Sequence, residues 1–230
     1  KTPSDSAKNK IERLSASTKN KPFRIRFIQG ISEIFHRKGL LFAILTFFFY
    51  VGAEAVIGLW SATYFREARG VSVSHSGLWV SLYYASITAG RIFVGFFVEK
   101  IGTRRAVIIG TFISATGLLM LILPLNIYFL MPFSMILIGV GFAPMYPCIM
   151  QETPKRFGSF APIATGYQMG LSNIGYTGLP ILVALISQNV TLHLIPFFAV
   201  FFLVLFALFS TLLSRVYAEP EPLAIDNIKD

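Results

Sequence analysis

Charge and cysteine are both scarce in this sequence. Charged residues make up 13% of its 230 residues, about half of the share that is usual in a soluble domain. The single cysteine, Cys148, has no partner for an internal disulfide. The sequence also lacks a nucleophile–base motif, a His or Cys cluster with metal-ligand spacing, and a glycine-rich phosphate loop. These absences exclude a disulfide scaffold, argue against an enzyme, and give no reason to expect a metal or another cofactor.

Long apolar runs are abundant instead. Hydrophobic residues make up 54% of the sequence, and 23 residues are Phe. About 20 apolar residues cross the hydrocarbon core of a bilayer, and six runs reach that length. They cover residues 39–65, 76–98, 106–123, 127–150, 163–187 and 194–213. Because the connections between them are short, consecutive helices are expected to be antiparallel neighbours. We therefore predict an all-α fold, an integral membrane bundle of six helices within residues 39–214.

The positive charge lies between the apolar runs and is strongly asymmetric. Of the 20 basic residues, 17 lie on one side of the six predicted spans. Arg66 and Arg69 lie on the other side, and Arg91 lies within a span. Basic residues favour the cytoplasmic side of a membrane, so we expect both termini in the cytoplasm and the protein in the plasma (inner) membrane. The net charge of +9 is thus explained by membrane orientation, and no nucleic-acid partner is expected.

Two polar segments flank the predicted spans. Residues 1–38 hold ten basic residues and begin as a linker-like segment rich in Lys, Ser, Thr and Asn. From Phe23 onwards apolar and basic residues interleave, which fits either an amphipathic helix at the membrane surface or a juxtamembrane extension of the first span. Residues 215–230 are expected to form a cytoplasmic tail. Because the sequence begins with Lys, we expect a piece of a longer protein or a processed product.

The second predicted span runs into a charged motif at residues 95–105, GFFVEKIGTRR. Its order of glycines, acid and bases resembles the loop motif of the major facilitator superfamily. Three further runs, at 39–60, 139–147 and 164–180, resemble helices seven, ten and eleven of the fucose–galactose–glucose:proton symporter branch of that superfamily. The resemblance implies the C-terminal six-helix half of a twelve-helix transporter, with residues 1–38 as its central loop.

The resemblance also implies a function and partners. It predicts secondary active transport of a small neutral solute, a sugar, by alternating access, with proton coupling. The expected partners are the solute, the lipid bilayer and an N-terminal six-helix half on the same or a separate chain. Two other interpretations stay open. One is a transport-incompetent half that assembles with or regulates another membrane protein, and the other is an exporter of drugs or organic solutes from the same superfamily.

The charged motif is either a conformational latch or a loop that only orients the protein. As a latch, Glu99, which stands where the family more usually has Asp, would pair with Arg104 or Arg105. Gly95 would permit close helix approach, and Gly102 would permit the tight turn. The expected latch residues are Gly95, Glu99, Lys100, Gly102, Arg104 and Arg105.

Three residues outside the motif are also expected to act in gating. Arg91 lies near the cytoplasmic end of its span, where we expect it to anchor the charged motif and pair with an acid such as Glu152. Pro144 and Pro147 interrupt the fourth predicted span, because proline lacks the N–H group that a helix requires. They predict a bend that could open and close.

Polar side chains within the predicted spans are expected to line a cargo cavity. Glu54 is the only acid at membrane depth, where a charge costs about 2.5 kcal/mol or more, so it must face a cavity or a partner. A structural hydrogen bond to a neighbouring helix is the alternative for Glu54. Hydroxyl and amide groups on the other spans suit a polyol. The expected cavity-lining residues are Tyr50, Glu54, Ser61, Tyr84, Thr88, Gln168, Ser172 and Asn173.

Overall fold

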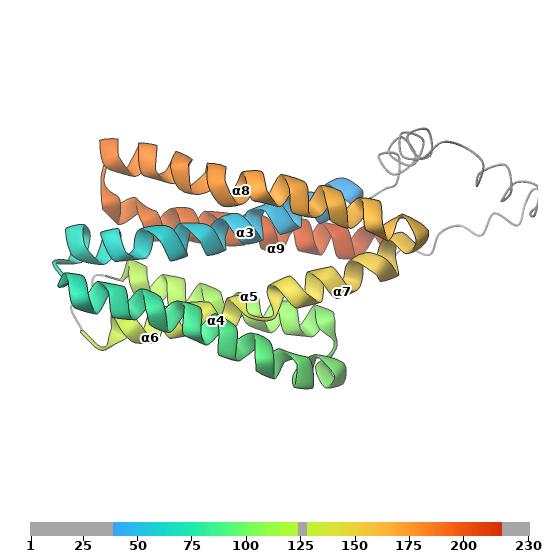
Figure 1. Cartoon of the computed structure of the whole chain (residues 1–230), viewed down its shortest axis with the longest axis horizontal. Helices are drawn as coiled ribbons and strands as arrows, with labels where there is room; N and C mark the ends of the chain where they lie inside the picture. Colours follow the sequence, from blue (N-terminus) through green and yellow to red (C-terminus); the bar gives the residue numbers. More distant parts are fainter. Residues whose placement is uncertain (1–38, 124–127, 218–230) are drawn as a thin grey trace, which may run out of the picture.

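The computed structural model describes residues 39–123 and 128–217, and in this part all regular structure is helical. The main helices are α3 (Leu40–Thr63), α4 (Val73–Ile101), α5 (Thr103–Ile122), α6 (Leu130–Phe142), α7 (Met145–Phe157), α8 (Ala161–Asn189) and α9 (Ile195–Val216) (Figure 1). A π-helical turn, Tyr64–Ala68, extends α3, and 3₁₀ turns at Gly158–Phe160 and Leu192–Leu194 precede α8 and α9. The predicted amphipathic helix within residues 1–38 lies outside the described residues, as does most of the predicted tail.

Five helical runs are long and apolar enough to cross a membrane. The fourth run, Leu130–Asn189, has 60 residues and would be about 90 Å long if straight, three times the thickness of the hydrocarbon core. It turns back between α7 and α8 (Figure 1), where Gly158 has a φ of 53° that favours glycine. The run therefore makes two passes, α6 with α7 and then α8. The predicted all-α membrane bundle of six passes is confirmed.

The fourth predicted span differs most from the structure. It is broken at Ala143 and Pro144, so the predicted bend at Pro144 is confirmed, and Pro147 lies in the first turn of α7. Helix α7 then continues to Phe157, which makes much of the predicted loop at 151–162 helical. Hydropathy marks where a chain leaves the apolar core, whereas a helix can continue into the polar region beyond it.

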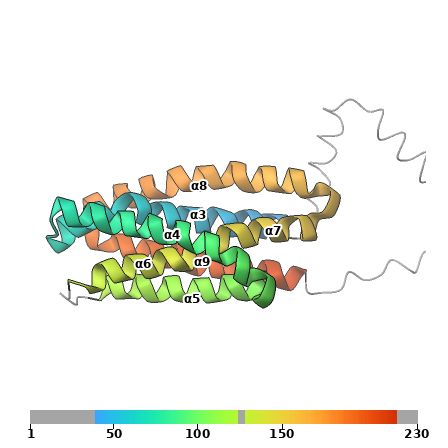
Figure 2. The ribbon, with the colours of Figure 1, turned by 60° about the horizontal axis from the view of Figure 1, so that its bottom comes forward.

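The helices form two groups of three that meet along a seam. Helix α3 packs mainly on α8 and α9, and α6 packs mainly on α4 and α5 (Figure 1). A view turned by 60° places α8 and α5 on opposite sides of the bundle (Figure 2). Helix α7 joins the α4–α5–α6 group to α8. Because α3 and α4 come from different groups, side chains that link them cross the seam.

A close backbone approach holds one group together, and a side-chain hydrogen bond links helices in the other. A Cβ atom added to Gly110 of α5 would lie 2.5 Å from the carbonyl oxygen of Gly141 in α6, so this helix pair requires small residues. In the other group, Trp60 donates its indole N–H to the carbonyl oxygen of Pro180 at 3.1 Å. Helix α8 is continuous through Pro180.

Candidate functional site

Glu54 of α3 and Arg91 of α4 form an ion pair across the seam. The Nη2 atom of Arg91 lies 3.3 Å from Oε1 and 3.4 Å from Oε2 of Glu54. The Tyr50 hydroxyl donates to the Glu54 carboxylate and accepts a bond from Arg91 Nη2 at 3.4 Å. The expected pairing of Arg91 with Glu152 was wrong. Two opposite charges at similar depth on facing helices compensate each other, so burying the pair costs less free energy than burying either charge alone in an apolar medium.

Two further tyrosines complete this polar cluster. The Tyr83 hydroxyl donates to the backbone carbonyl of Glu54 at 3.1 Å. The guanidinium carbon of Arg91 lies 5.6 Å from the ring centroid of Tyr146, within cation–π range. Sequence reasoning missed both tyrosines. The available signal for Tyr146 was its place between Pro144 and Pro147, just after the helix break.

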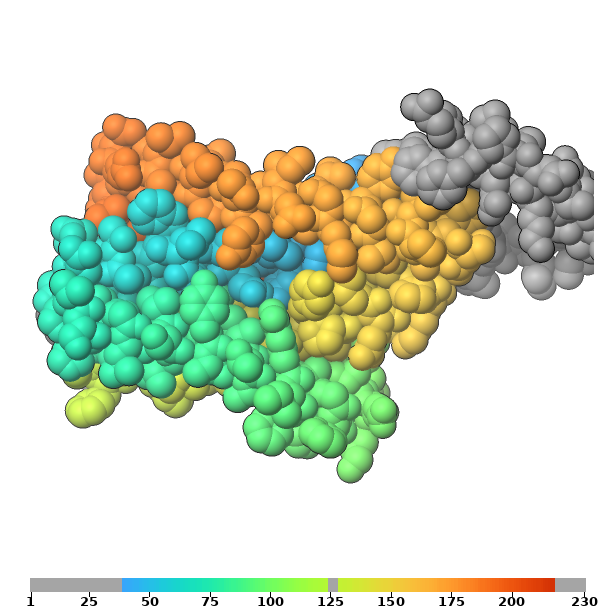
Figure 3. All heavy atoms as spheres, in the orientation of Figure 1, coloured from blue at the N-terminus to red at the C-terminus, as the bar shows by residue number. Residues whose placement is uncertain are grey.

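The cluster is partly open to the outside of the described bundle. The side chain of Arg91 is 40% exposed and that of Glu54 is 20% exposed, whereas Tyr50 is buried. Tyr84 and Thr88, which are also predicted cavity residues, are exposed on α4. In the space-filling view, atoms of α3 are visible between those of α8 and α4 (Figure 3). The ion pair is therefore accessible from outside the described bundle.

A hollow of about 380 Å³ lies between α3 and α8. It is lined by Leu59, Trp60, Tyr176, Thr177, Pro180 and Ile181. Asn173 is exposed and lies three and four residues before Tyr176 and Thr177, on the same helix face. The hollow thus combines two aromatic rings, a hydroxyl and a nearby amide. The sequence did indicate Asn173, but not Trp60.

Besides Tyr50, three more predicted cavity residues are buried between helices. Gln168 is 1% exposed, accepts a hydrogen bond from the Thr153 hydroxyl at 2.9 Å and donates one to the Ala43 carbonyl at 3.3 Å. The position of Gln168 thus corrects the prediction that it lines a cavity, because its amide is used to tie α8 to α7 and α3. Ser172 is buried and donates to a carbonyl of its own helix, and Ser61 is buried too.

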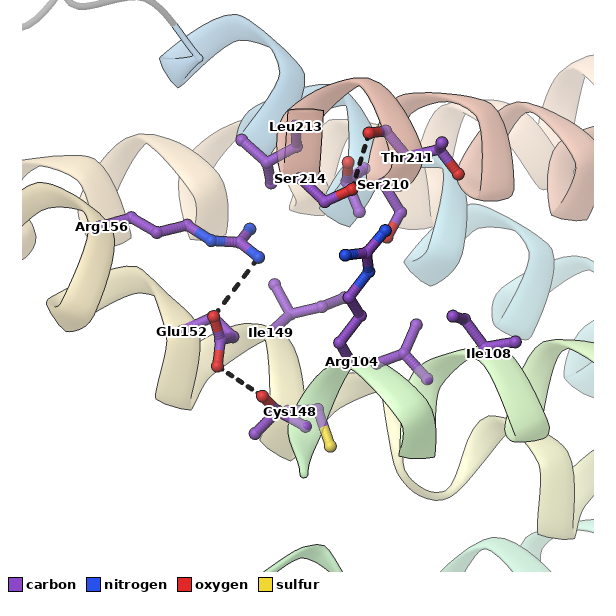
Figure 4. A pocket seen from close by; sticks show the side chains of 13 residues that line it. Arg104, Ile108, Cys148, Ile149, Glu152, Arg156, Ser210, Thr211, Leu213 and Ser214 are labelled. Carbon is purple, nitrogen blue, oxygen red and sulfur yellow. Dashed lines mark hydrogen bonds and ion pairs between the residues drawn. The ribbon is translucent and has the colours of Figure 1, made fainter. Parts of the chain in front are cut away.

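A second polar cluster lies at the end of the bundle that carries the charged motif. Glu152 of α7 accepts a hydrogen bond from the Thr103 hydroxyl of α5. Its carboxylate also pairs with Lys155 at 3.3 Å and Arg156 at 3.4 Å. These contacts border a cavity of about 70 Å³ into which the Arg104 side chain extends from α5 (Figure 4). Glu152 therefore connects α5 to α7.

The charged motif itself is only partly arranged as predicted. Gly102 has a φ of 82°, so the predicted glycine turn is confirmed. Within residues 39–123 and 128–217, however, Glu99 forms no ion pair, and a Cβ atom added to Gly95 would meet no atom within 4 Å. The expected Glu99 pairing with Arg104 or Arg105 is thus absent from this part of the chain. Glu99 and Gly95 lie at the exposed surface, whereas Glu152 occupies the position between helices.

Comparison with known proteins decides the family. The family model of the Major Facilitator Superfamily matches residues 42–228. This chain belongs to the Major Facilitator Superfamily. It is accordingly a multi-pass membrane chain, and the apolar helices described above are the membrane-spanning part of a Major Facilitator Superfamily fold.

Several known proteins are similar to this superfamily member. "Bypass of stop codon protein 6" of Saccharomyces cerevisiae (strain ATCC 204508 / S288c) is 25% identical over 213 residues, which cover 86% of this chain and 41% of that protein. The crystal structure of tetrameric PepTSo2 has a TM-score of 0.67 at 17% identity and covers 78% of this chain and 41% of its own. The peptide transporter POT in complex with sulfate has a TM-score of 0.66 at 20% identity, with coverage of 78% and 38%. FucP, a Major Facilitator Superfamily transporter in the outward conformation, has a TM-score of 0.67 at 13% identity, with coverage of 81% and 44%.

The sequence identity and the coverage limit what these similarities show about this chain. At such identities the solved structures show the fold alone. The chain spans less than half of the length of each of these proteins.

Proposed function

We propose that this chain is the C-terminal half of a secondary active transporter that moves a small neutral solute, a sugar, across the plasma membrane by alternating access. The observation that carries the proposal is the partly exposed ion pair of Glu54 and Arg91 at membrane depth. Ionisable residues inside a membrane bundle typically belong to a substrate or ion pathway. The N-terminal half would cover this face and complete the cavity.

The chemistry of the face suits a neutral polyol. Glu54 and Arg91 compensate each other in formal charge, so the site offers donors and acceptors without a net charge. The rings of Trp60 and Tyr176 in the adjacent hollow offer apolar surface for the faces of a sugar ring. A sugar placed here would hydrogen-bond to the ion pair and pack on the aromatic rings.

The position of the pair across the seam supports a role in both coupling and movement. We propose that Glu54 also carries the coupled proton. A proton on its carboxylate would remove the attraction that holds Arg91 at 3.3 Å. Because α3 and α4 belong to different helix groups, loss of this attraction would loosen the seam.

A second candidate cargo is an organic anion. Arg91 is 40% exposed, and a guanidinium binds carboxylates in a bidentate manner. Protonation of Glu54 would release Arg91 for such a ligand. This alternative corresponds to an exporter of organic solutes within the same superfamily.

Transport assays with the assembled protein test the proposal. The chain would be reconstituted with its N-terminal half in proteoliposomes and offered labelled sugars and organic anions, with and without a pH gradient. We expect uphill sugar uptake that depends on the gradient. Glu54→Gln should abolish uphill accumulation while leaving cargo exchange, because an amide keeps the size of the carboxyl but does not titrate.

Controls separate the possible outcomes. Glu67 is an exposed acid in the π-helical turn that extends α3, where it pairs with Arg66, and Glu67→Gln should leave accumulation unchanged. Uptake of anions without uptake of sugars would favour the second candidate. If Glu54→Leu retains both exchange and accumulation, the site assignment is rejected. If no cargo moves although both halves assemble, a structural or regulatory half is the better interpretation.

A further inference from the structure

An apolar groove lies between α4 and α5 near the loop that joins them. The two helices contact each other little, because each packs on α6, which forms the floor. The groove has a volume of about 530 Å³, and its lining includes Phe93, Phe97, Ile109, Ile113 and Val140. This volume falls in the range of about 300–1,000 Å³ that accommodates small organic ligands. Phe93, Phe97 and Ile109 are all at least half exposed, so the groove opens to the outside of the described bundle.

Helix periodicity places one cation of α4 beside the mouth of the groove. Successive residues are rotated by about 100° around a helix axis. Lys100 follows Phe97 by three residues and Phe93 by seven, so it lies on the flank of the groove-lining face. Glu99 lies roughly opposite that face, and its negative charge is directed away from the groove. Lys100 is exposed and has no ion pair within the described residues.

A second cation on α5 lies at the same mouth. Arg105 precedes Ile109 by four residues, one helical turn, and is exposed. Arg104 extends to the other side of α5, into the cavity beside Glu152. The groove therefore ends at two cations, Lys100 and Arg105, and neither has an ion pair in the part of the chain that the structure describes. Arg104, next to Arg105 but on the other side of α5, serves as the control residue.

We propose that this groove binds one anionic phospholipid, with an acyl chain between α4 and α5 and the phosphate at Lys100 and Arg105. The apolar walls lie within the membrane-spanning helices, and the cations lie where those helices end. The charge at the mouth is complementary to a phosphate group. Anionic lipids are concentrated in the cytoplasmic leaflet, the side on which basic loops are retained. The bound lipid would hold the ends of α4 and α5 at a fixed separation.

Photolabelling of the full chain tests the site. The chain would be reconstituted in phosphatidylcholine vesicles that contain phosphatidylglycerol with a photoactivatable acyl chain, and labelled peptides would be identified by mass spectrometry. We expect labels to concentrate on the segments 93–97 and 109–113. A phosphatidylcholine probe with the same acyl chain should label these segments about tenfold less, since two surface cations each favour an anionic headgroup.

Variants locate the headgroup. Lys100→Ala with Arg105→Ala should reduce phosphatidylglycerol labelling of the groove about tenfold, and Arg104→Ala should leave it within twofold. Equal labelling by the two lipids overturns the proposal, and so does an equal loss in the Arg104→Ala variant. Absence of label from both segments also overturns it, because the groove would then be covered by protein. The comparison of the two lipids uses the unaltered chain, so it decides the proposal even if a variant fails to fold.

Discussion

Removal of one partner from the Glu54–Arg91 pair should destabilise the protein more than removal of both. Arg91→Met leaves the Glu54 carboxylate without its cation, and Glu54→Gln leaves the Arg91 guanidinium without its anion. A lone charge at the centre of a membrane helix costs about 2.5–3.5 kcal/mol. Because the two side chains are 40% and 20% exposed, we expect about half of that, roughly 1–2 kcal/mol for each single variant.

The double variant should recover much of this loss. With both charges removed no ion is stranded, so the coupling free energy in the cycle should exceed the loss of either single variant, at about 2–3 kcal/mol. For a chain of this size, about 2–4 °C of melting temperature corresponds to 1 kcal/mol. Each single variant should therefore melt about 2–8 °C below the unaltered chain, and the double variant should melt at a higher temperature than either single variant.

Thermal melting of the purified full chain in one detergent would measure the cycle. The Arg66–Glu67 pair provides a matched control, because it has a similar N–O distance of 3.4 Å but side chains that are 46% and 54% exposed. Exposed pairs contribute about 0–1 kcal/mol, so the coupling in that control cycle should be small. Additive effects at Glu54 and Arg91, or a coupling no larger than in the control, would refute the argument that the pair offsets charge inside the membrane.

Three further outcomes are expected. A cysteine probe placed at Arg69 should react from outside the cell and one at Lys155 only after permeabilisation; the reverse result would contradict the proposed orientation. Gln168→Leu should lower stability by about 1–3 kcal/mol, measured by melting, because it removes two buried hydrogen bonds that tie α8 to α7 and α3. An unchanged melting temperature together with weaker cargo binding would instead indicate a cavity residue. Gly110→Val should cost about 1–3 kcal/mol through overpacking against α6, and a variant as stable as the original chain would show that the two helices can separate without loss.

Features that depend on local chemistry were predictable from the sequence. The continuous apolar runs determined the number of passes, because hydrocarbon admits helices whose backbone bonds are satisfied internally. Gly102 and Pro144 were correctly expected to mark a turn and a break, since each acts on its own backbone. The helical extension from 151 to 157 was missed, because hydropathy does not report helix beyond the apolar core.

Features that depend on how helices are rotated against one another were not predictable. From the sequence, either Glu54 or Glu152 could be the partner of Arg91. The structure decides for Glu54, because α3 and α4 place these two side chains opposite each other. Gln168 and Asn173 are separated by five residues on one helix and looked equally suited to cargo. The structure buries Gln168 and exposes Asn173, a distinction that depends on the position of α3 beside α8.

The ion pair across the seam also bears on how the chain is made. Glu54 and Arg91 are 37 residues apart, on helices that leave the ribosome one after the other with residues 69–72 between them. Other contacts of α3 can form only much later in synthesis, because their partners are far along the chain. Ala43 and Gln168 are 125 residues apart, and Trp60 and Pro180 are 120 residues apart. During synthesis α3 and α4 can therefore enter the bilayer as a hairpin in which the two charges at membrane depth, Glu54 and Arg91, already neutralise each other. The insertion machinery would then handle a hairpin with no uncompensated charge at membrane depth, well before α8 and α9 are synthesised and pack around α3.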